Sequence, residues 1–213
     1  EGYVEEVADG ANFWQVMADR YGLSLDVVGG SLENIPSDGP LITVSNHPYG
    51  ILDGLMKGCM LSQRRHGDFN VLAHRGVRKS PDIEKIILPI SFDETKEAAK
   101  LNLATRAEAV SYLKAGGAIG VFPGGTVSTA QRKQSTAMDP TWRNFTAKMV
   151  TKSDAVVVPI FFDGSNSRLF QVASRLHYTL RMGLMVREFK RKTNKPVRVV
   201  IGEPIARAEL DKY

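Results

Sequence analysis

The chain has 213 residues, of which 43% are hydrophobic and 24% are charged, a balance typical of a globular domain with a real core. Its single cysteine, Cys59, excludes an intramolecular disulfide and a thiol-based metal cluster. The formal charge of +5 predicts an acidic partner, but leaves nucleic acid, an anionic membrane surface and an acidic carrier protein open. No apolar run reaches the roughly 18–20 residues that span a bilayer, and no signal-peptide pattern opens the sequence, so we expect any membrane contact to be peripheral.

The first part of the chain alternates helical and strand patterns. Residues 11–22 repeat apolar side chains as an amphipathic helix does, and the pattern over 23–29 predicts a strand. A short β-branched run over 40–46, bounded by turn residues, is typical of a buried strand. Apolar residues at helical spacing then predict a helix over 51–65.

The same alternation continues through the rest of the chain. The clearest helix covers 95–117, where Thr95 can cap the start and Gly116–Gly117 end it. Further strands are predicted over 69–75, 85–92, 118–125 (where the strand runs into a glycine turn), 155–162 and 196–202. No repeat or linker divides the chain, so we predict a single α/β domain over 1–213 with a mostly parallel sheet flanked by helices.

A histidine and an aspartate flank a tight turn in the stretch SNHPYGILDG, residues 45–54. His47 ends a predicted strand, and Asp53 lies in the first turn of the next helix; Pro48 and Gly50 favour a bend between them. Asp53 can then hold one ring nitrogen and raise the basicity of the other, as in a serine-type triad whose nucleophile is the substrate's own hydroxyl. Spacing alone leaves equally open a strand-end histidine that merely bonds a helix N-terminal aspartate.

A second turn, in GVFPGGTVS over 120–128, follows another predicted strand. Its backbone N–H groups can converge on an anion, which the oxygen of a carbonyl under attack requires. The alternative is an ordinary Gly-Gly turn. Neither the Gly-Lys-Ser/Thr ending of a P-loop nor a Gly-x-Ser-x-Gly elbow is present. Since both turns follow strands, we expect His47 and Gly124–Gly125 to share one edge of the sheet.

These stretches resemble the glycerolipid acyltransferases of the 1-acylglycerol-3-phosphate acyltransferase type. Asn46-His47 with Asp53 is similar to the first block of that family. Phe122–Ser128 is similar to its Phe-Pro-Glu-Gly-Thr-x-Ser block, and Val158-Pro159-Ile160 to its last block. The resemblance covers roughly residues 35–205, which leaves 1–34 as a helical and strand lead-in.

The resemblance implies an activity and a set of roles. His47 would be the general base that deprotonates an acceptor hydroxyl, and Asp53 would orient it. Acyl-coenzyme A or acyl carrier protein would supply the fatty acyl thioester as a co-substrate, without a metal, another cofactor or a covalent acyl-enzyme. The implied oxyanion and substrate contacts are Asn46, Gly124, Gly125, Thr126 and Ser128.

Two departures from the family pattern point to one of its branches. Five residues, not four, separate His47 from Asp53, and Asn-His-Pro-x-Gly-x-x-Asp-Gly resembles a hemolysin-like branch. Gly124 replaces the usual glutamate and Val127 the frequent arginine, at positions associated with a glycerol-phosphate acceptor. The branch includes enzymes resembling O-acyltransferases that finish ornithine and related amino-acid lipids. We therefore expect a lyso-aminolipid acceptor such as lyso-ornithine lipid, with lysophosphatidic acid as the alternative.

Basic residues mark further candidate contacts. The segment 164–192 combines them with apolar residues at helical spacing, which suits an anionic bilayer surface. A core stripe with a solvated basic face stays open as the alternative. Acceptor-side candidates, which follow the Val-Pro-Ile strand, are Gly164, Asn166, Ser167 and Arg168. Candidates for the phosphates of coenzyme A or for the acidic carrier protein, with solubility as the alternative role, are Arg75, Arg78 and Lys79.

Three classes of function result. The leading one is a lysolipid O-acyltransferase, peripheral at the cytoplasmic face of the inner membrane. The second is a non-catalytic lipid-binding protein of the same fold, against which the intact His47–Asp53 pair argues. A nucleic-acid-binding domain ranks last, because the basic residues are dispersed without aromatic interleaving or a helix-turn-helix signature.

The other histidines show no metal-ligand spacing. Cys59 lies in an apolar helical segment and is expected to be a small buried side chain rather than a nucleophile.

Overall fold

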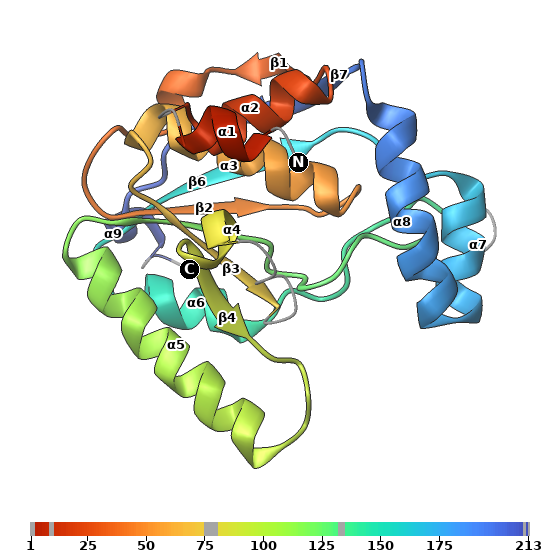
Figure 1. The fold of residues 1–213 in the computed structure, drawn as a ribbon. Coiled ribbons are helices and arrows are strands. Elements are labelled where there is room, and N and C mark those ends of the chain that lie inside the picture. Colours follow the sequence, from red (N-terminus) through yellow and green to blue (C-terminus); the bar gives the residue numbers. More distant parts are fainter. Residues whose placement is uncertain (1–2, 9–10, 75–80, 132–134, 211, 213) are drawn as a thin grey trace.

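The computed structural model describes residues 3–8, 11–74, 81–131, 135–210 and 212. In this part of the chain seven strands form one sheet, in the order β1-β7-β6-β2-β5-β3-β4 (Figure 1). Neighbouring strands are parallel except β6 and β7, which are antiparallel. The strands are β1 (Ser24–Gly30), β2 (Leu41–Ser45), β3 (Asn70–His74), β4 (Ile87–Ile90), β5 (Ala118–Val121), β6 (Val156–Phe162) and β7 (Pro196–Ile201). The predicted α/β fold with a mostly parallel sheet is confirmed.

Helices cover both faces of the sheet (Figure 1). The helices predicted over 11–22, 51–65 and 95–117 are present as α2, α3 and α5, and the Thr95 hydroxyl accepts the N–H of Ala98 at the start of α5. The described helices are α1 (Tyr3–Ala8), α2 (Phe13–Arg20), the 3-10 turn η1 (Leu32–Asn34), α3 (Ile51–Arg65), α4 (Pro81–Glu84), α5 (Lys96–Lys114), α6 (Asn144–Val150), α7 (Arg168–Leu176), α8 (Tyr178–Lys192) and α9 (Arg207–Leu210).

The core lies in two layers, one on each face of the sheet. Successive residues of a strand point to opposite faces, so Leu41 packs with the α3 side and Ile42 with the side of α5 and α6. Both side chains are fully buried, because β2 is a central strand covered on both faces. This two-sided burial explains the continuous apolar run in the sequence.

The central strands bring the predicted turns together. β2 pairs in parallel with β5 on one side and with β6 on the other. Residues that follow these strands therefore emerge at a single edge of the sheet, as expected for an open α/β sheet. His47, Phe122 and Asp163 all follow their strands within two residues.

The basic segment 164–192 forms a hairpin of two helices rather than one continuous helix. The chain is extended at His177 (φ −161°, ψ 139°), whose ring Nδ1 accepts the N–H of Thr179 and starts α8. The α7–α8 hairpin lies beyond one side of the sheet, at the right of Figure 1. Leu176 is 71% exposed and Leu180 is 52% exposed, so the apolar stripe is not core. None of the described helices is long and apolar enough to cross a bilayer.

Candidate active site

His47 and Asp53 face each other across the turn between β2 and α3. His47 Nδ1 lies 3.0 Å from Asp53 Oδ2; the Asp53 side chain is fully buried and the His47 side chain is 18% exposed. The same oxygen accepts the backbone N–H groups of Tyr49 at 2.8 Å and Gly50 at 2.9 Å. Among the described residues the ring nitrogen makes no hydrogen bond of regular geometry, so its contact with Asp53 is one of charge and distance.

The turn requires glycine at position 50. Gly50 has φ +88°, and a Cβ atom there would lie 3.0 Å from Val127 and 3.1 Å from the sulfur of Met185. Since a side chain would be both strained and crowded, glycine alone lets the chain reverse and present two N–H groups to Asp53. The pattern Pro-x-Gly between the histidine and the aspartate thus has a direct physical reason.

The imidazole and the peptide of His47 are held separately. The ring stacks on Phe122, with 4.1 Å between the ring centroids and 30° between the planes. The backbone N–H of His47 donates to Asp139 Oδ1 at 3.0 Å, and its C=O accepts the N–H of Ser128 at 2.8 Å. With Nδ1 directed to Asp53, Nε2 is the nitrogen left to take a proton from a substrate.

Asp139 is a site residue that the sequence reasoning missed. Besides the His47 N–H, it accepts the Ser128 hydroxyl and, at 3.3 Å, the indole N–H of Trp142. A Cβ atom on Gly124 would lie 3.3 Å from Asp139 Oδ2. The carboxylate of Asp139 therefore lies beside position 124, where the similar block of the acyltransferase family has glutamate. No local pattern marks it, because Asp139 lies in an irregular stretch outside every predicted element.

The glycine turn after β5 is held by a hydrogen bond within the turn and by two more from α8. Gly125 (φ +70°) donates its N–H to Phe122 O at 2.9 Å. The N–H groups of Gly124 and Thr126 have no partner in the described part of the chain. The guanidinium of Arg181 donates to the Thr126 hydroxyl at 2.7 Å and to Val127 O at 2.8 Å. An arginine thus reaches this turn from α8, although position 127 carries a buried valine.

Asn46 and Ser128, two of the predicted substrate contacts, form hydrogen bonds that join separate segments of the site. The side-chain amide of Asn46 donates to Phe162 O at 2.9 Å and accepts the Phe162 N–H at 2.7 Å, so it joins the ends of β2 and β6. Ser128 is buried, and its hydroxyl and N–H bond to Asp139 and His47.

The acceptor-side candidates are placed around Tyr49 and the start of α7. Asn166 donates to Tyr49 O at 3.3 Å, and a Cβ atom on Gly164 would collide with the Tyr49 hydroxyl. Ser167 bonds the buried Glu188 of α8 through both its hydroxyl and its N–H, which fixes α7 against α8. Arg168 is exposed at the start of α7. The predicted phosphate contacts Arg75, Arg78 and Lys79 lie outside the described residues.

A buried lysine, Lys57, lies next to the Phe122 ring on which His47 stacks. Lys57 is 0% exposed, donates to Val121 O at 2.7 Å and lies 4.0 Å from the centroid of the Phe122 ring. Burial lowers the pKa of Lys57 well below its ordinary value, against the smaller raising effects of Asp53 and Asp139. Its place one helical turn after Asp53 is readable from the sequence, but its burial is not, because lysine normally lies at the surface.

Cys59 packs against the core from α3, but it is partly buried rather than fully buried as the sequence predicted. Its thiol lies 3.2 Å from Trp14 O, to which it donates, and burial raises its pKa to about 12. A thiol with this pKa carries almost no thiolate at neutral pH and makes a poor nucleophile. In the described part of the chain no group of three His, Cys, Asp or Glu side chains is placed to hold a metal ion.

Comparison with known proteins connects this geometry to a family. The profile of the family described as Acyltransferase matches residues 11–212. The chain is 24% identical over 211 residues to the lyso-glycine lipid O-acyltransferase of Phocaeicola vulgatus, covering 95% of this chain and 72% of that protein. It is 25% identical over 209 residues to the protein of the same name from Bacteroides thetaiotaomicron, covering 95% and 74%.

A solved structure shows the same fold. The crystal structure of the 1-acyl-sn-glycerophosphate (LPA) acyltransferase PlsC from Thermotoga maritima is similar with a TM-score of 0.52 and 21% identity. The similarity covers 94% of this chain and 76% of that one. The resemblance drawn from the His47 and Phe122 blocks is confirmed by the family match over nearly the whole chain. The chain belongs to the glycerolipid acyltransferase family.

Proposed function

We propose that the protein is a peripheral membrane O-acyltransferase that moves a fatty acyl group from an acyl thioester to the hydroxyl of a lyso-aminolipid. The arrangement of His47 and Asp53 carries the proposal, because it orients one ring nitrogen and leaves the other for a substrate. The family match and the names of the two lyso-glycine lipid O-acyltransferases support it.

The reaction needs no nucleophile from the protein. His47 Nε2 removes the proton of the acceptor hydroxyl while the hydroxyl oxygen attacks the thioester carbonyl carbon. The tetrahedral intermediate then loses its C–S bond, and the histidine returns the proton to the departing thiolate. The products are an ester and a free thiol. Asp53 stabilises the imidazolium that exists between the two proton transfers.

The glycine turn supports the charge that develops on the carbonyl oxygen. The N–H groups of Gly124 and Thr126 flank the turn that Gly125 closes, and both are without a partner among the described residues. Removing one such hydrogen-bond donor from an oxyanion hole typically costs about 2.7–4 kcal/mol of transition-state stabilisation. We assign the backbone of Gly124–Thr126 this role, with Asn46 and Ser128 holding its surroundings.

The acceptor is proposed to be an amino-acid lipid rather than lysophosphatidic acid. A Cβ atom at position 124 would lie 3.2 Å from Pro140 and 3.3 Å from Asp139, so a glutamate there would crowd this turn and add a second carboxylate beside Asp139. Both relatives carry lyso-glycine lipid in their names, which makes a glycine headgroup the first candidate and ornithine the second. The acyl thioester comes from coenzyme A or acyl carrier protein.

The α7–α8 hairpin is proposed as the membrane contact. Leu169, Leu176 and Leu180 are each 47% exposed or more, next to basic side chains of both helices. Apolar side chains that enter the interfacial region together with cations that attract anionic headgroups are the two features of an interfacial helix. Because α8 also bonds the turn at Thr126, the active site would lie close to the lipid.

The proposal is tested by following free thiol and acylated lipid together. Purified protein in detergent micelles is given acyl-coenzyme A or acyl carrier protein thioester with lyso-glycine lipid, lyso-ornithine lipid or lysophosphatidic acid. We expect transfer to an aminolipid with a kcat/KM at least tenfold above that for lysophosphatidic acid. His47→Ala should abolish transfer and His66→Asn, at an exposed left-handed position (φ 51°), should not. Thiol release with no acceptor at all, or a preference for lysophosphatidic acid, would refute the proposal.

A further inference from the structure

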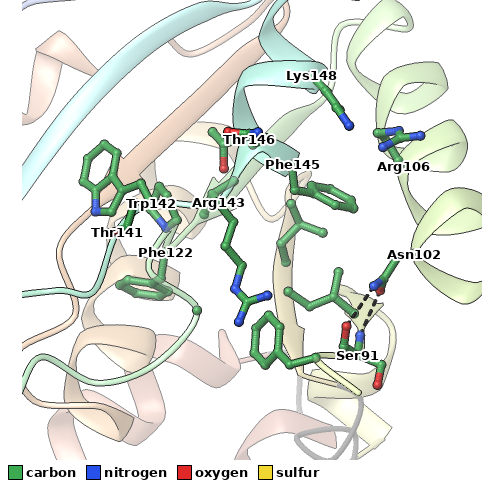
Figure 2. A pocket seen from close by; sticks show the side chains of 17 residues that line it. Ser91, Asn102, Arg106, Phe122, Thr141, Trp142, Arg143, Phe145, Thr146 and Lys148 are labelled. Carbon is green, nitrogen blue, oxygen red and sulfur yellow. Dashed lines mark hydrogen bonds between the residues drawn. The ribbon is translucent and has the colours of Figure 1, made fainter. Parts of the chain in front are cut away.

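A cavity of about 590 Å³ lies beside the catalytic pair, between the carboxyl ends of β3, β4 and β5 and the helices α5 and α6 (Figure 2). Its walls combine polar side chains with apolar ones, among them Ile90, Phe122 and Phe145. Three cationic side chains also line it: Arg106 from α5, Arg143 just before α6, and Lys148 from α6. The cavity therefore combines apolar surface with concentrated positive charge.

The three cations have no acidic partners in the described part of the chain. None of them makes an ion pair there, and the guanidinium of Arg143 lies over the ring of Phe92, 4.4 Å from its centroid. Arg106 and Lys148 point toward one another in Figure 2. Like charges directed at one cavity repel each other, and an anion placed between them relieves that repulsion.

The ring of Phe122 separates the cavity from the proposed base, so the two lie on opposite sides of one side chain. This ring lines the cavity and stacks on the imidazole of His47 at 4.1 Å. Arg143 is fixed to the same turn, because its backbone N–H donates to Pro123 O at 3.1 Å. Of the three cations, Arg143 is thus the one that the main chain ties directly to the glycine turn.

We infer that this cavity binds an anionic group of the substrate, and that Arg143 takes the carboxylate of the acceptor headgroup. The inference rests on the proposed function, because it assumes an amino-acid lipid as acceptor. A glycine joined to a fatty acid through its nitrogen keeps a free carboxylate, a short chain of atoms from a hydroxyl on the same acid. In the inferred complex the carboxylate contacts Arg143 while the hydroxyl contacts His47. Guanidinium and carboxylate form charge-assisted, often bidentate hydrogen bonds.

The other source of an anion is the acyl donor, whose phosphates lie at the far end of a long pantetheine arm. A phosphate so distant from the thioester suits Arg106 and Lys148 better than a residue tied to the catalytic turn. The two sources differ in which substrate loses affinity when Arg143 is changed. They can therefore be separated by binding measurements that involve no turnover.

Calorimetric titration with N-octanoylglycine, its methyl ester and coenzyme A provides the test. N-octanoylglycine carries the carboxylate on an apolar chain, and the ester lacks only the charge. We expect the native protein to bind the acid about 10- to 100-fold more tightly than the ester. Arg143→Gln should remove that difference, Arg143→Lys should keep part of it, and Arg20→Gln, at an exposed position of α2, should leave it unchanged. Coenzyme A affinity should be the same in the native protein and in Arg143→Gln.

The outcomes separate the inference from the proposed function. Equal binding of acid and ester by the native protein, or loss of coenzyme A affinity alone in Arg143→Gln, overturns the carboxylate subsite even where aminolipid transfer is observed. Charge-selective binding that depends on Arg143 upholds the subsite, even where the protein transfers no acyl group to an aminolipid and the proposed function fails. Circular dichroism of each variant confirms that the fold is retained.

Discussion

The carboxylate of Asp139 accepts the backbone N–H of His47 at 3.0 Å, although the two residues are 92 positions apart in the chain. The bond joins the irregular segment before α6 to the end of β2. It fixes the peptide of His47, the proposed base, while Asp53 and Phe122 contact its ring. In the proposed mechanism we therefore assign Asp139 a positioning role, which acts through His47 and the turn at Ser128.

Asp139→Ala is expected to lower kcat about 10- to 100-fold with a smaller effect on KM, because the His47 peptide loses its hydrogen-bond acceptor and a small misplacement of a base is costly. Asp139→Asn keeps an oxygen for that N–H and should restore much of the rate. Steady-state kinetics of both variants check this, with Asp154→Ala at an exposed position as the control. Equal losses for alanine and asparagine would point to the charge rather than to positioning.

His47→Ala is expected to lower kcat by about 100- to 10,000-fold, the usual contribution of a general base. Asp53→Asn should also be severely impaired, because an amide cannot stabilise an imidazolium and the buried carboxylate accepts two turn N–H groups. Pre-steady-state thiol release measures both effects. An Asp53→Asn variant whose pH–rate profile matches that of the native enzyme would contradict the pairing.

Lys57 should make stability depend on pH in one direction. Its folded-state pKa is depressed by burial, so the unfolded chain binds a proton that the folded chain binds less readily. Stability is therefore lost as pH falls below the ordinary lysine value and gained as pH rises toward it. Urea unfolding between pH 7 and pH 10 should show the native free energy of unfolding rising relative to that of Lys57→Met, by no more than about 1.4 kcal/mol per pH unit. Parallel curves would show that folding does not lower the pKa of Lys57.

Membrane binding is expected to need both the apolar and the basic side chains of the α7–α8 hairpin. Leu176→Ser combined with Leu180→Ser should weaken binding to anionic vesicles at least about tenfold, since these exposed leucines would lose their burial in the interface. Added salt should weaken native binding as well, because each basic residue contributes about 1 kcal/mol near an anionic surface. Vesicle co-sedimentation measures both. Leu103→Ser, on α5 at 59% exposure, is the matched control.

The sequence predicted elements well where one local pattern dominates. Continuous apolar runs identified the buried β2 and β6, and a capping threonine and a glycine stop identified α5. It did not reveal the break at His177, because the apolar spacing of α7 runs on in phase into α8 and only an extended backbone separates them. It also missed α6, a short helix in a stretch with little apolar periodicity.

The proximity of the candidate site residues was predictable only where one short stretch contains them. His47, Asp53 and Gly50 lie in one decapeptide, where chain geometry alone brings the imidazole to the carboxylate. Asp139 and Arg181 reach the same loops from remote segments, and their arrival depends on how whole elements pack. No pattern in a single sequence encodes such a contact.

The hydrogen bonds from Arg181 to Thr126 and Val127 attach helix α8 of the hairpin to the glycine turn. Helix α8 exposes Leu180 to solvent, and the next residue, Arg181, bonds the glycine turn. Tilting of α8 would either carry the turn with it or break both bonds. If the hairpin docks on a membrane as proposed, a displacement of α8 would therefore alter the turn whose N–H groups we assign to the carbonyl oxygen.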